Sequence, residues 1–190
     1  VITHEVRKAT SPAFIIGAQI MWNCITPSLA VAKVCGASFT RATALTGTTN
    51  SPFGVVNANP LKVANYRKLI GAQDIAIIAE IAGYHFHGFG EDTPIAQKAR
   101  MAMNVGADAI EVMHSDEETN NRLVHDIKTA SPSTPIILGG GTDLSNVRRR
   151  LKEANGALVG SCFENKNWGG NIDESIVREY MGIVRSMEKE

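Results

Sequence analysis

The chain has 190 residues, of which 44% are hydrophobic, enough to bury the core of one domain. Basic and acidic residues both number 19, and the resulting formal net charge of zero excludes the basic surplus typical of a dedicated nucleic-acid-binding protein. The longest apolar stretches, such as Ala13–Met21, are far shorter than the ~20 residues of a membrane span. The three cysteines form no Cys-x-x-Cys pair, which predicts reduced thiols in a soluble protein of the cytoplasm or an organelle matrix.

Candidate helices and strands alternate along the chain. Thr26-Pro27, Asn59-Pro60 and Thr93-Pro94 each place a capping side chain before a proline at the first helical position. The predicted helices are 27–35, 60–70, 94–105, 118–130, 143–155 and 173–187, and residues 1–9 form the tail of one more. The predicted strands are 14–21, 39–45, 75–82, 109–114, 135–139 and 157–161. Their nearly continuous apolar character is typical of parallel strands covered on both faces.

A Gly-Ala step followed by an apolar run recurs at Gly36, Gly71, Gly106 and Gly156, which indicates one repeated helix–strand unit. A glycine just past a helix takes the left-handed conformation that ends the helix. Six such units predict an α/β protein of the (β/α)8 TIM-barrel type, in one domain over residues 1–190. A complete barrel takes about 250 residues, so we expect an N-terminally incomplete one. An open six-stranded sheet is the structural alternative.

Two glycine-containing loops follow the last two predicted strands. Loops at the corresponding place in phosphate-binding barrels form the anion site, because glycine lets the backbone N–H groups approach an anion closely. The candidate phosphate-binding residues are Gly139, Gly140, Gly141 and Thr142 in the first loop and Gly160, Ser161 and Cys162 in the second. The alternative is that these glycines only make tight turns at a barrel rim. The basic run Arg148–Lys152 between the loops predicts a solvated helix face that could steer anions.

Three ionisable residues interrupt apolar strands: Arg41, Glu80 and Glu111. They belong to three successive predicted strands, so they could meet inside a barrel or near its mouth. One interpretation is a structural ion pair, because a buried carboxylate needs a partner. The other makes Glu80 or Glu111 an acid/base group and lets Arg41 orient a carboxylate or phosphate.

Histidines gather after the strands that carry the two glutamates. His85 and His87 follow the first of them, and His114 ends the second beside Asp116. His85 is a candidate general base at neutral pH. We predict no metal site and no cofactor, because the ligand set is incomplete. The alternative is a divalent metal bound by this His-x-His pair near the two carboxylates.

Several segments resemble the BtpA/SgcQ family over essentially the whole chain. They are Phe39–Arg41, Leu45–Gly47, the run from Gly47 to Ala72, Gly106–Ala109 and Gly156–Ser161. The resemblance implies a ribulose-phosphate-binding-type barrel that lacks its first two strands here. One cyanobacterial member of that family is linked to stable accumulation of photosystem I, and no reaction is attached to the family.

This chain departs from the family pattern at the predicted catalytic rim. Where the family tends to have Asn-Val-Leu-Arg-Asn-Asp, residues 19–24 keep only Asn23 among the polar positions. Glu80, Ala82, Tyr84 and His85 replace a family pattern of Asp, His, Lys and His, and Met113-His114 replaces Thr-Gly. The phosphate loops are therefore better kept than the rim, whose candidate catalytic residues are Glu80, His85, Glu111, Arg41 and Asn23.

Two functions are compatible with these features. The first is binding of a phosphorylated small molecule, a sugar phosphate or nucleotide-like compound, with acid/base chemistry of the isomerase or lyase type if the protein is an enzyme. The second is a non-catalytic assembly or stability factor for a protein complex. The strand edge beside residues 14–21 also predicts a homo-oligomer, because an exposed edge is most simply covered by a second copy.

Overall fold

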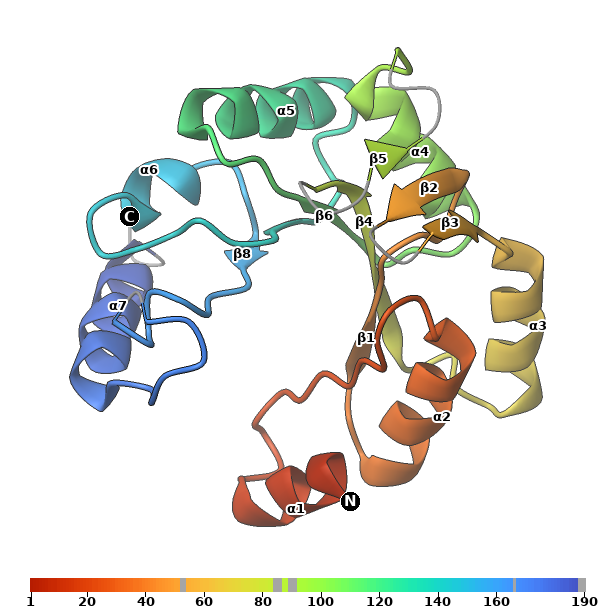
Figure 1. Cartoon of the computed structure of the whole chain (residues 1–190), viewed down its shortest axis with the longest axis horizontal. Coiled ribbons are helices and arrows are strands. Elements are labelled where there is room, and N and C mark those ends of the chain that lie inside the picture. The colour runs from red at the N-terminus through yellow and green to blue at the C-terminus, as the bar shows by residue number, and fades with distance from the viewer. Residues whose placement is uncertain (52–53, 84–86, 89–91, 166, 188–190) are drawn as a thin grey trace. The chain divides into compact units, whose positions relative to one another are not determined.

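The computed structural model describes residues 1–51, 54–83, 87–88, 92–165 and 167–187, with the backbone alone at 87–88 (Figure 1). The helices are α1 (Ile2–Ala9), α2 (Ile25–Cys35), α3 (Pro60–Leu69), α4 (Ile95–Asn104), α5 (Glu117–Ala130), α6 (Val147–Arg150) and α7 (Glu174–Met187). The strands are β1 (Phe39–Ala42), β2 (Thr48–Ser51), β3 (Gly54–Asn57), β4 (Ala76–Ala82), β5 (His87–Gly88), β6 (Ala109–Val112), β7 (Ile136–Leu138) and β8 (Gly156–Ala157). Contacts divide the chain into two compact units, Val1–Ile110 and Glu111–Glu190, so the single domain stays a prediction.

The first unit is built on parallel strands covered by helices. β1 and β4 pair in register from Phe39 with Ala76 to Ala42 with Ala79. Leu29 and Ala32 of α2 are fully buried, and Ile77 of β4 is 1% exposed. This burial on α2 and β4 follows from the continuous apolar runs of the sequence.

The predicted strand at 14–21 is not a regular strand. Its ladder consists of one bridge, between Gly17 and Phe39, flanked by the Ser38 N–H to Ile16 O and Ala18 N–H to Phe39 O bonds. The next free N–H, that of Ile20, donates to the Ser28 hydroxyl at 2.9 Å instead. Competition from this side chain ends the pairing. Gly17 also has to be glycine, because a Cβ there would lie 2.3 Å from the Phe39 ring.

A small antiparallel sheet, absent from the sequence prediction, follows β1. β2 pairs with β3 from Thr48 with Asn57 to Ser51 with Gly54, and β5 pairs with β2 on the other side. The strands are four residues long at most, and β3 is largely exposed. The sequence did not predict these strands, because their residues form neither a long apolar run nor a regular alternation of apolar and polar residues.

The second unit repeats the strand–helix plan with the short strands β7 and β8, whereas its helices α5 and α7 are each 14 residues long. β7 and β8 are parallel, with Ile137 opposite Gly156 and Leu138 opposite Ala157. The boundary between the two units falls within β6, after Ile110. The strands of the larger sheet follow the order β1-β4-β6-β7-β8. The predicted helix at 143–155 is reduced to α6, because Asp143 accepts hydrogen bonds from the N–H groups of Ser145 and Asn146 and forms a turn first.

The helix-end signals are partly confirmed. The Asn59 side chain accepts from the Lys62 N–H at 2.9 Å, as a cap should. The caps at Thr26 and Thr93 are wrong: α2 begins already at Ile25, and α4 begins after Pro94, neither with a side-chain cap bond. Gly36, Gly71 and Gly106 have positive φ past their helices, whereas Gly156 lies in β8.

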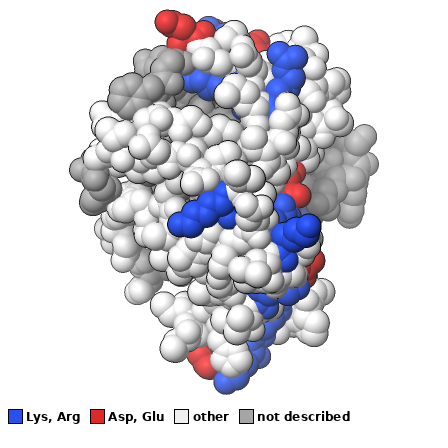
Figure 2. All heavy atoms as spheres, turned by 90° about the vertical axis from the view of Figure 1, so that its right-hand side faces the viewer, with Lys and Arg blue, Asp and Glu red and all other residues white. Residues whose placement is uncertain are grey.

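The zero net charge is not spread evenly over the surface. Figure 2 shows more basic than acidic side chains on the face that it draws. A balanced total is therefore compatible with local fields that attract anions. In the described ranges, no helix has the length and apolarity required to span a bilayer.

Candidate functional site

The two glycine loops leave the same edge of the sheet in the second unit. β7 and β8 are paired parallel strands, and the Leu158 N–H extends the pairing to Leu138 O at 2.8 Å. The chain enters the first loop at Gly139, directly after β7, and enters the second two residues after this contact. Both therefore start at the carboxyl ends of neighbouring strands, the end at which parallel α/β sheets bind ligands.

The first loop has conformations and contacts that require glycine. Gly140 and Gly141 have φ values of +152° and +74°, which side-chain-bearing residues rarely adopt. A Cβ on Gly141 would lie 2.5 Å from Nη1 of Arg150, and one on Gly139 would lie 2.4 Å from Oε1 of Glu111. Because these two positions have no Cβ, the loop backbone can contact the side chains of Arg150 and Glu111 directly.

The loop amides are the groups that an anion would use. Gly139 donates its N–H to Val112 O at 2.9 Å. Within the part of the chain that the structure describes, no protein acceptor lies in hydrogen-bond range of the following loop amides, those of Gly140, Gly141, Thr142, Gly160 and Ser161. Backbone N–H groups in a glycine-rich turn form a concave site for negative charge.

Arg150 lies under the first loop and was misjudged from the sequence. Its neighbours Arg148 and Arg149 are exposed, as expected for a solvated basic face. Arg150 is only 4% exposed; its Nη1 donates to Gly141 O at 2.6 Å and its Nη2 to His114 O at 3.5 Å. Burial lowers the pKa of this guanidinium from its ordinary value, and carboxylates at longer range partly oppose that shift.

The Thr142 side chain has a structural partner. Tyr180 of α7 donates its hydroxyl to Thr142 Oγ1 at 2.9 Å, and both residues are at least 96% buried. The Tyr180 ring packs edge-on against Phe163, with ring centroids 5.3 Å apart. Burial raises the pKa of Tyr180 above its ordinary value. The Thr142 hydroxyl therefore holds the first loop to α7, whereas its amide has no acceptor in the described part of the chain.

The second loop is more open. Ser161 is exposed and Cys162 is half-buried, and a Cβ on Gly160 would meet nothing within 4 Å. The Gly160 carbonyl accepts from the Phe163 N–H at 2.8 Å, which forms a turn. Gly160 is thus a site where a side chain can be added without a clash.

The charged residues inside the strands fall into different units. In the first unit, Nη2 of Arg41 lies 2.7 Å from Oε2 of Glu80, with side-chain exposures of 23% and 5%. This is the ion pair expected for a buried carboxylate. Glu111 belongs to the second unit, is fully buried and lies against Gly139. Glu111 is therefore the predicted acid/base candidate that lies beside the first glycine loop.

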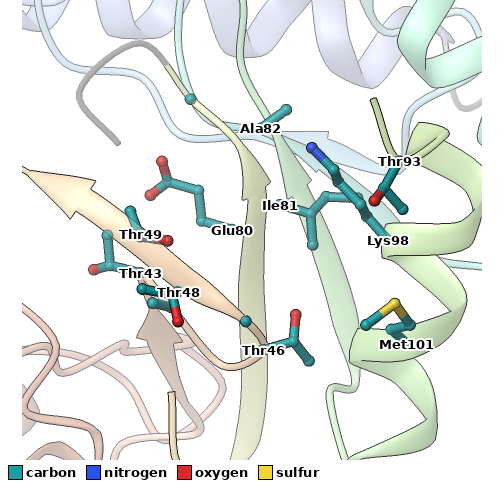
Figure 3. A pocket seen from close by; sticks show the side chains of 13 residues that line it. Thr43, Thr46, Thr48, Thr49, Glu80, Ile81, Ala82, Thr93, Lys98 and Met101 are labelled. Carbon is teal, nitrogen blue, oxygen red and sulfur yellow. The ribbon is translucent and has the colours of Figure 1, made fainter. Parts of the chain in front are cut away.

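A separate cavity of about 110 Å³ lies at the carboxyl ends of β1 and β4 in the first unit (Figure 3). Its lining includes five threonines: Thr43, Thr46, Thr48, Thr49 and Thr93. Figure 3 shows Glu80 and Lys98 on different walls, from β4 and α4. The threonines after β1 were not recognised in the sequence, although their density after a strand end, at 43, 46, 48 and 49, is a usable signal.

The remaining predicted residues have more ordinary surroundings. Asn23 donates to Ala44 O and accepts from Ala44 N, both at 2.9 Å, so its amide holds the loop after β1. His85 lies outside the described residues. His114 Nδ1 accepts from the Asp116 N–H at 3.0 Å. Across the described segments, no group of three or more His, Cys, Asp or Glu side chains is arranged to hold a metal ion.

Residues 1–187 match the BtpA family. The chain belongs to this family. Its relatives include the "Photosystem I biogenesis protein BtpA" of Synechocystis, 26% identical over 85% of this chain and 55% of the relative. A protein of Archaeoglobus fulgidus is 28% identical over 98% of this chain and 71% of its own length, and a mitochondrial protein of Caenorhabditis elegans is 27% identical over 96% and 67%. The chain thus spans little more than half of the Synechocystis protein.

Solved structures confirm the fold class of this BtpA-family chain. The phosphoribosyl anthranilate isomerase of Thermococcus kodakaraensis has a TM-score of 0.63 at 15% identity, covering 96% of this chain and 79% of its own. A 3-hexulose-6-phosphate synthase has a TM-score of 0.65 at 17% identity, covering 94% and 77%. A tryptophan synthase alpha-subunit of Pyrococcus furiosus has a TM-score of 0.61 at 19% identity, covering 88% and 64%. At these identities the likeness concerns the α/β barrel fold alone.

Proposed function

We propose that this BtpA-family protein binds a phosphorylated small molecule, a sugar phosphate or nucleotide-like compound, at the loops after β7 and β8. The observation that carries the proposal is the set of acceptor-free amides in residues 140–142 and 160–161, at the carboxyl ends of two paired parallel strands. Such amides bind oxyanions without needing a charged side chain at the surface. The proposal assigns no reaction.

The fold relatives favour the same ligand class. The names of the isomerase from Thermococcus and of the hexulose-phosphate synthase both refer to phosphorylated sugars. Phosphate sites of barrel enzymes commonly use the loops after the last two strands. This support comes from the fold, so the ligand itself has to be found by measurement.

Thermal unfolding in a series of anions tests the proposal. Inorganic phosphate or a phosphorylated metabolite at 100 times its Kd would add about 2.7 kcal/mol to the free energy of unfolding, which raises Tm by about 5–10 °C. Chloride at the same ionic strength serves as the reference. No stabilisation by phosphate or by any member of a panel of sugar phosphates and nucleotides would contradict the proposal.

A charge reversal at the second loop locates the site. Ser161→Asp places a carboxylate among the loop amides and should weaken phosphate binding about tenfold or more through repulsion. Ser133→Asp is the matched control: Ser133 is equally an exposed serine of the second unit, but it precedes β7. Titration calorimetry of both variants should show the loss only in Ser161→Asp, and equal affinities would place the anion elsewhere.

A second function is favoured by the name of the Synechocystis relative, which refers to photosystem I biogenesis. An assembly factor needs a protein surface and does not depend on an anion at these loops. A purified complex that retains its protein partner in the Ser161→Asp variant would favour this second function. A partner that is lost together with phosphate affinity would contradict it.

A further inference from the structure

Arg150 carries a buried charge whose hydrogen-bond partners are neutral. Its guanidinium donates to the carbonyl oxygens of Gly141 and His114, and among the described residues no carboxylate lies in ion-pair range of it. A buried charge is costly unless an opposite charge compensates it. Arg150, which is only 4% exposed, therefore carries this cost of burial.

The carboxylates that act on Arg150 from further away are engaged elsewhere. Glu117 pairs with Arg149 at 3.1 Å. Asp143 accepts from the Ser145 hydroxyl and from nearby backbone N–H groups, and Asp116 accepts from the Thr119 N–H at 2.7 Å. These carboxylates partly offset the lowering of the Arg150 pKa by burial, but they do not accept hydrogen bonds from it.

The His114 segment that Arg150 contacts also has buried donors without an acceptor. Two buried side-chain nitrogens of the second unit have no hydrogen-bond partner among the described residues: Nε of Arg150 and Nδ2 of Asn120. Both residues contact His114, because Arg150 donates to its carbonyl and Asn120 Oδ1 accepts from its N–H at 3.0 Å. A phosphate group, which at neutral pH mainly accepts hydrogen bonds, suits a guanidinium that still has an unused donor.

We propose that Arg150 supplies the positive charge of the phosphate site and that the bound ligand's phosphate is its counter-ion. This inference rests on the proposed function and adds to it a residue on which affinity depends. Gly141 makes the arrangement possible: its missing side chain lets the guanidinium approach the loop, where a Cβ would lie 2.5 Å from Nη1. The guanidinium thus contacts the loop whose amides have no acceptor in the described part of the chain.

The test compares Arg150→Met with Arg148→Met. Methionine keeps the length and apolar character that a buried site accepts, and removal of an uncompensated buried charge is compatible with folding. We expect Arg150→Met to lower the affinity for inorganic phosphate about tenfold or more, as expected when a charge-assisted interaction is lost. Arg148 is an exposed neighbour bonded to Ser186, so its variant should bind as the wild type does.

The rise of Tm with phosphate separates a ligand role from a structural one. For a counter-ion role, Arg150→Met loses this rise. For a structural role, the rise stays, although Tm in phosphate-free buffer falls because the carbonyls of Gly141 and His114 lose their donor. Should Arg150→Met not fold, Arg150→Lys keeps the charge and is expected to retain most of the binding, whereas Arg150→Gln removes the charge and is expected to lose it.

The outcomes distinguish this inference from the proposed function. Phosphate binding by the wild type that persists undiminished in a folded Arg150→Met or Arg150→Gln variant overturns the role of Arg150 and leaves the loop site intact. A wild type that binds no phosphorylated ligand overturns the proposed function, and the counter-ion role falls with it.

Discussion

At the scale of single residues, Glu80 can lose neither its charge nor its partner without a penalty. Its carboxylate is almost fully buried and lies 2.7 Å from Arg41. We expect Glu80→Gln to lower the free energy of unfolding by about 3 kcal/mol, because it breaks the largely buried ion pair with Arg41. Denaturant unfolding followed by circular dichroism measures the change.

The control for this substitution is Glu5→Gln. Glu5 pairs with Lys8, but both side chains are 61% exposed, and such pairs contribute little to stability. The double variant Arg41→Met/Glu80→Met should recover part of the loss, since it removes both charges. If Glu80→Gln is as stable as Glu5→Gln, the pair has no structural role, which would favour a role for Glu80 in the threonine-lined cavity.

The sequence identified the glycine loops but not the arginine beneath them. Gly140 and Gly141 stand out because few other residues tolerate their conformations, so their type alone carries information. Arg150 is one of three consecutive arginines, and nothing in its type separates it from Arg148 and Arg149. A usable signal is the spacing of Arg150 three residues after Val147, which places both on one helix face. Val147 is 1% exposed, so that face is buried.

At the scale of secondary-structure elements, an Asn-Pro or Thr-Pro pair in the sequence does not guarantee a helix cap. Asn59 caps α3 through the Lys62 N–H, whereas Thr93 makes no cap bond to α4. We expect Asn59→Ala to cost about 1 kcal/mol of stability. Thr93→Ala should stay within about 0.5 kcal/mol of the wild type. Urea unfolding of both variants checks the difference, and equal losses would contradict it.

Most helices and parallel strands could be predicted because each is specified by its own residues. α3, α4, α5 and α7 begin and end within one residue of their predicted bounds. The antiparallel β2–β3–β5 sheet could not, because its stability depends on pairing between segments up to about forty residues apart. The 14–21 segment failed for a related reason: Ser28 takes a backbone donor that a strand would have used.

At the scale of the whole molecule, the 14–21 segment predicts association between copies. Phe14, Ile15 and Met21 are more than half exposed beside β1, an edge position that favours pairing with another chain. For a chain of these residues alone we expect a mass in light scattering of at least twice 20.4 kDa. Ile15→Lys should shift it towards the monomer.

Val34→Lys is the matched control for that substitution. Val34 is 84% exposed on α2 of the same unit and does not belong to the 14–21 segment. Its mass should equal that of the wild type. A wild type that is monomeric at all concentrations, or a dimer that both lysine variants leave intact, would contradict this use of the segment.

Tyr180 has a consequence for how the chain can vary. It is the buried residue of α7 within the described part of that helix, and it bonds to the threonine that closes the first glycine loop. α7 thus holds in place the loop that is proposed to bind phosphate, although α7 itself supplies no group to the proposed phosphate contact. Natural variants or proteolytic products that lack α7 are therefore expected to bind the proposed ligand more weakly, even though they keep the strands β7 and β8 that precede the two loops.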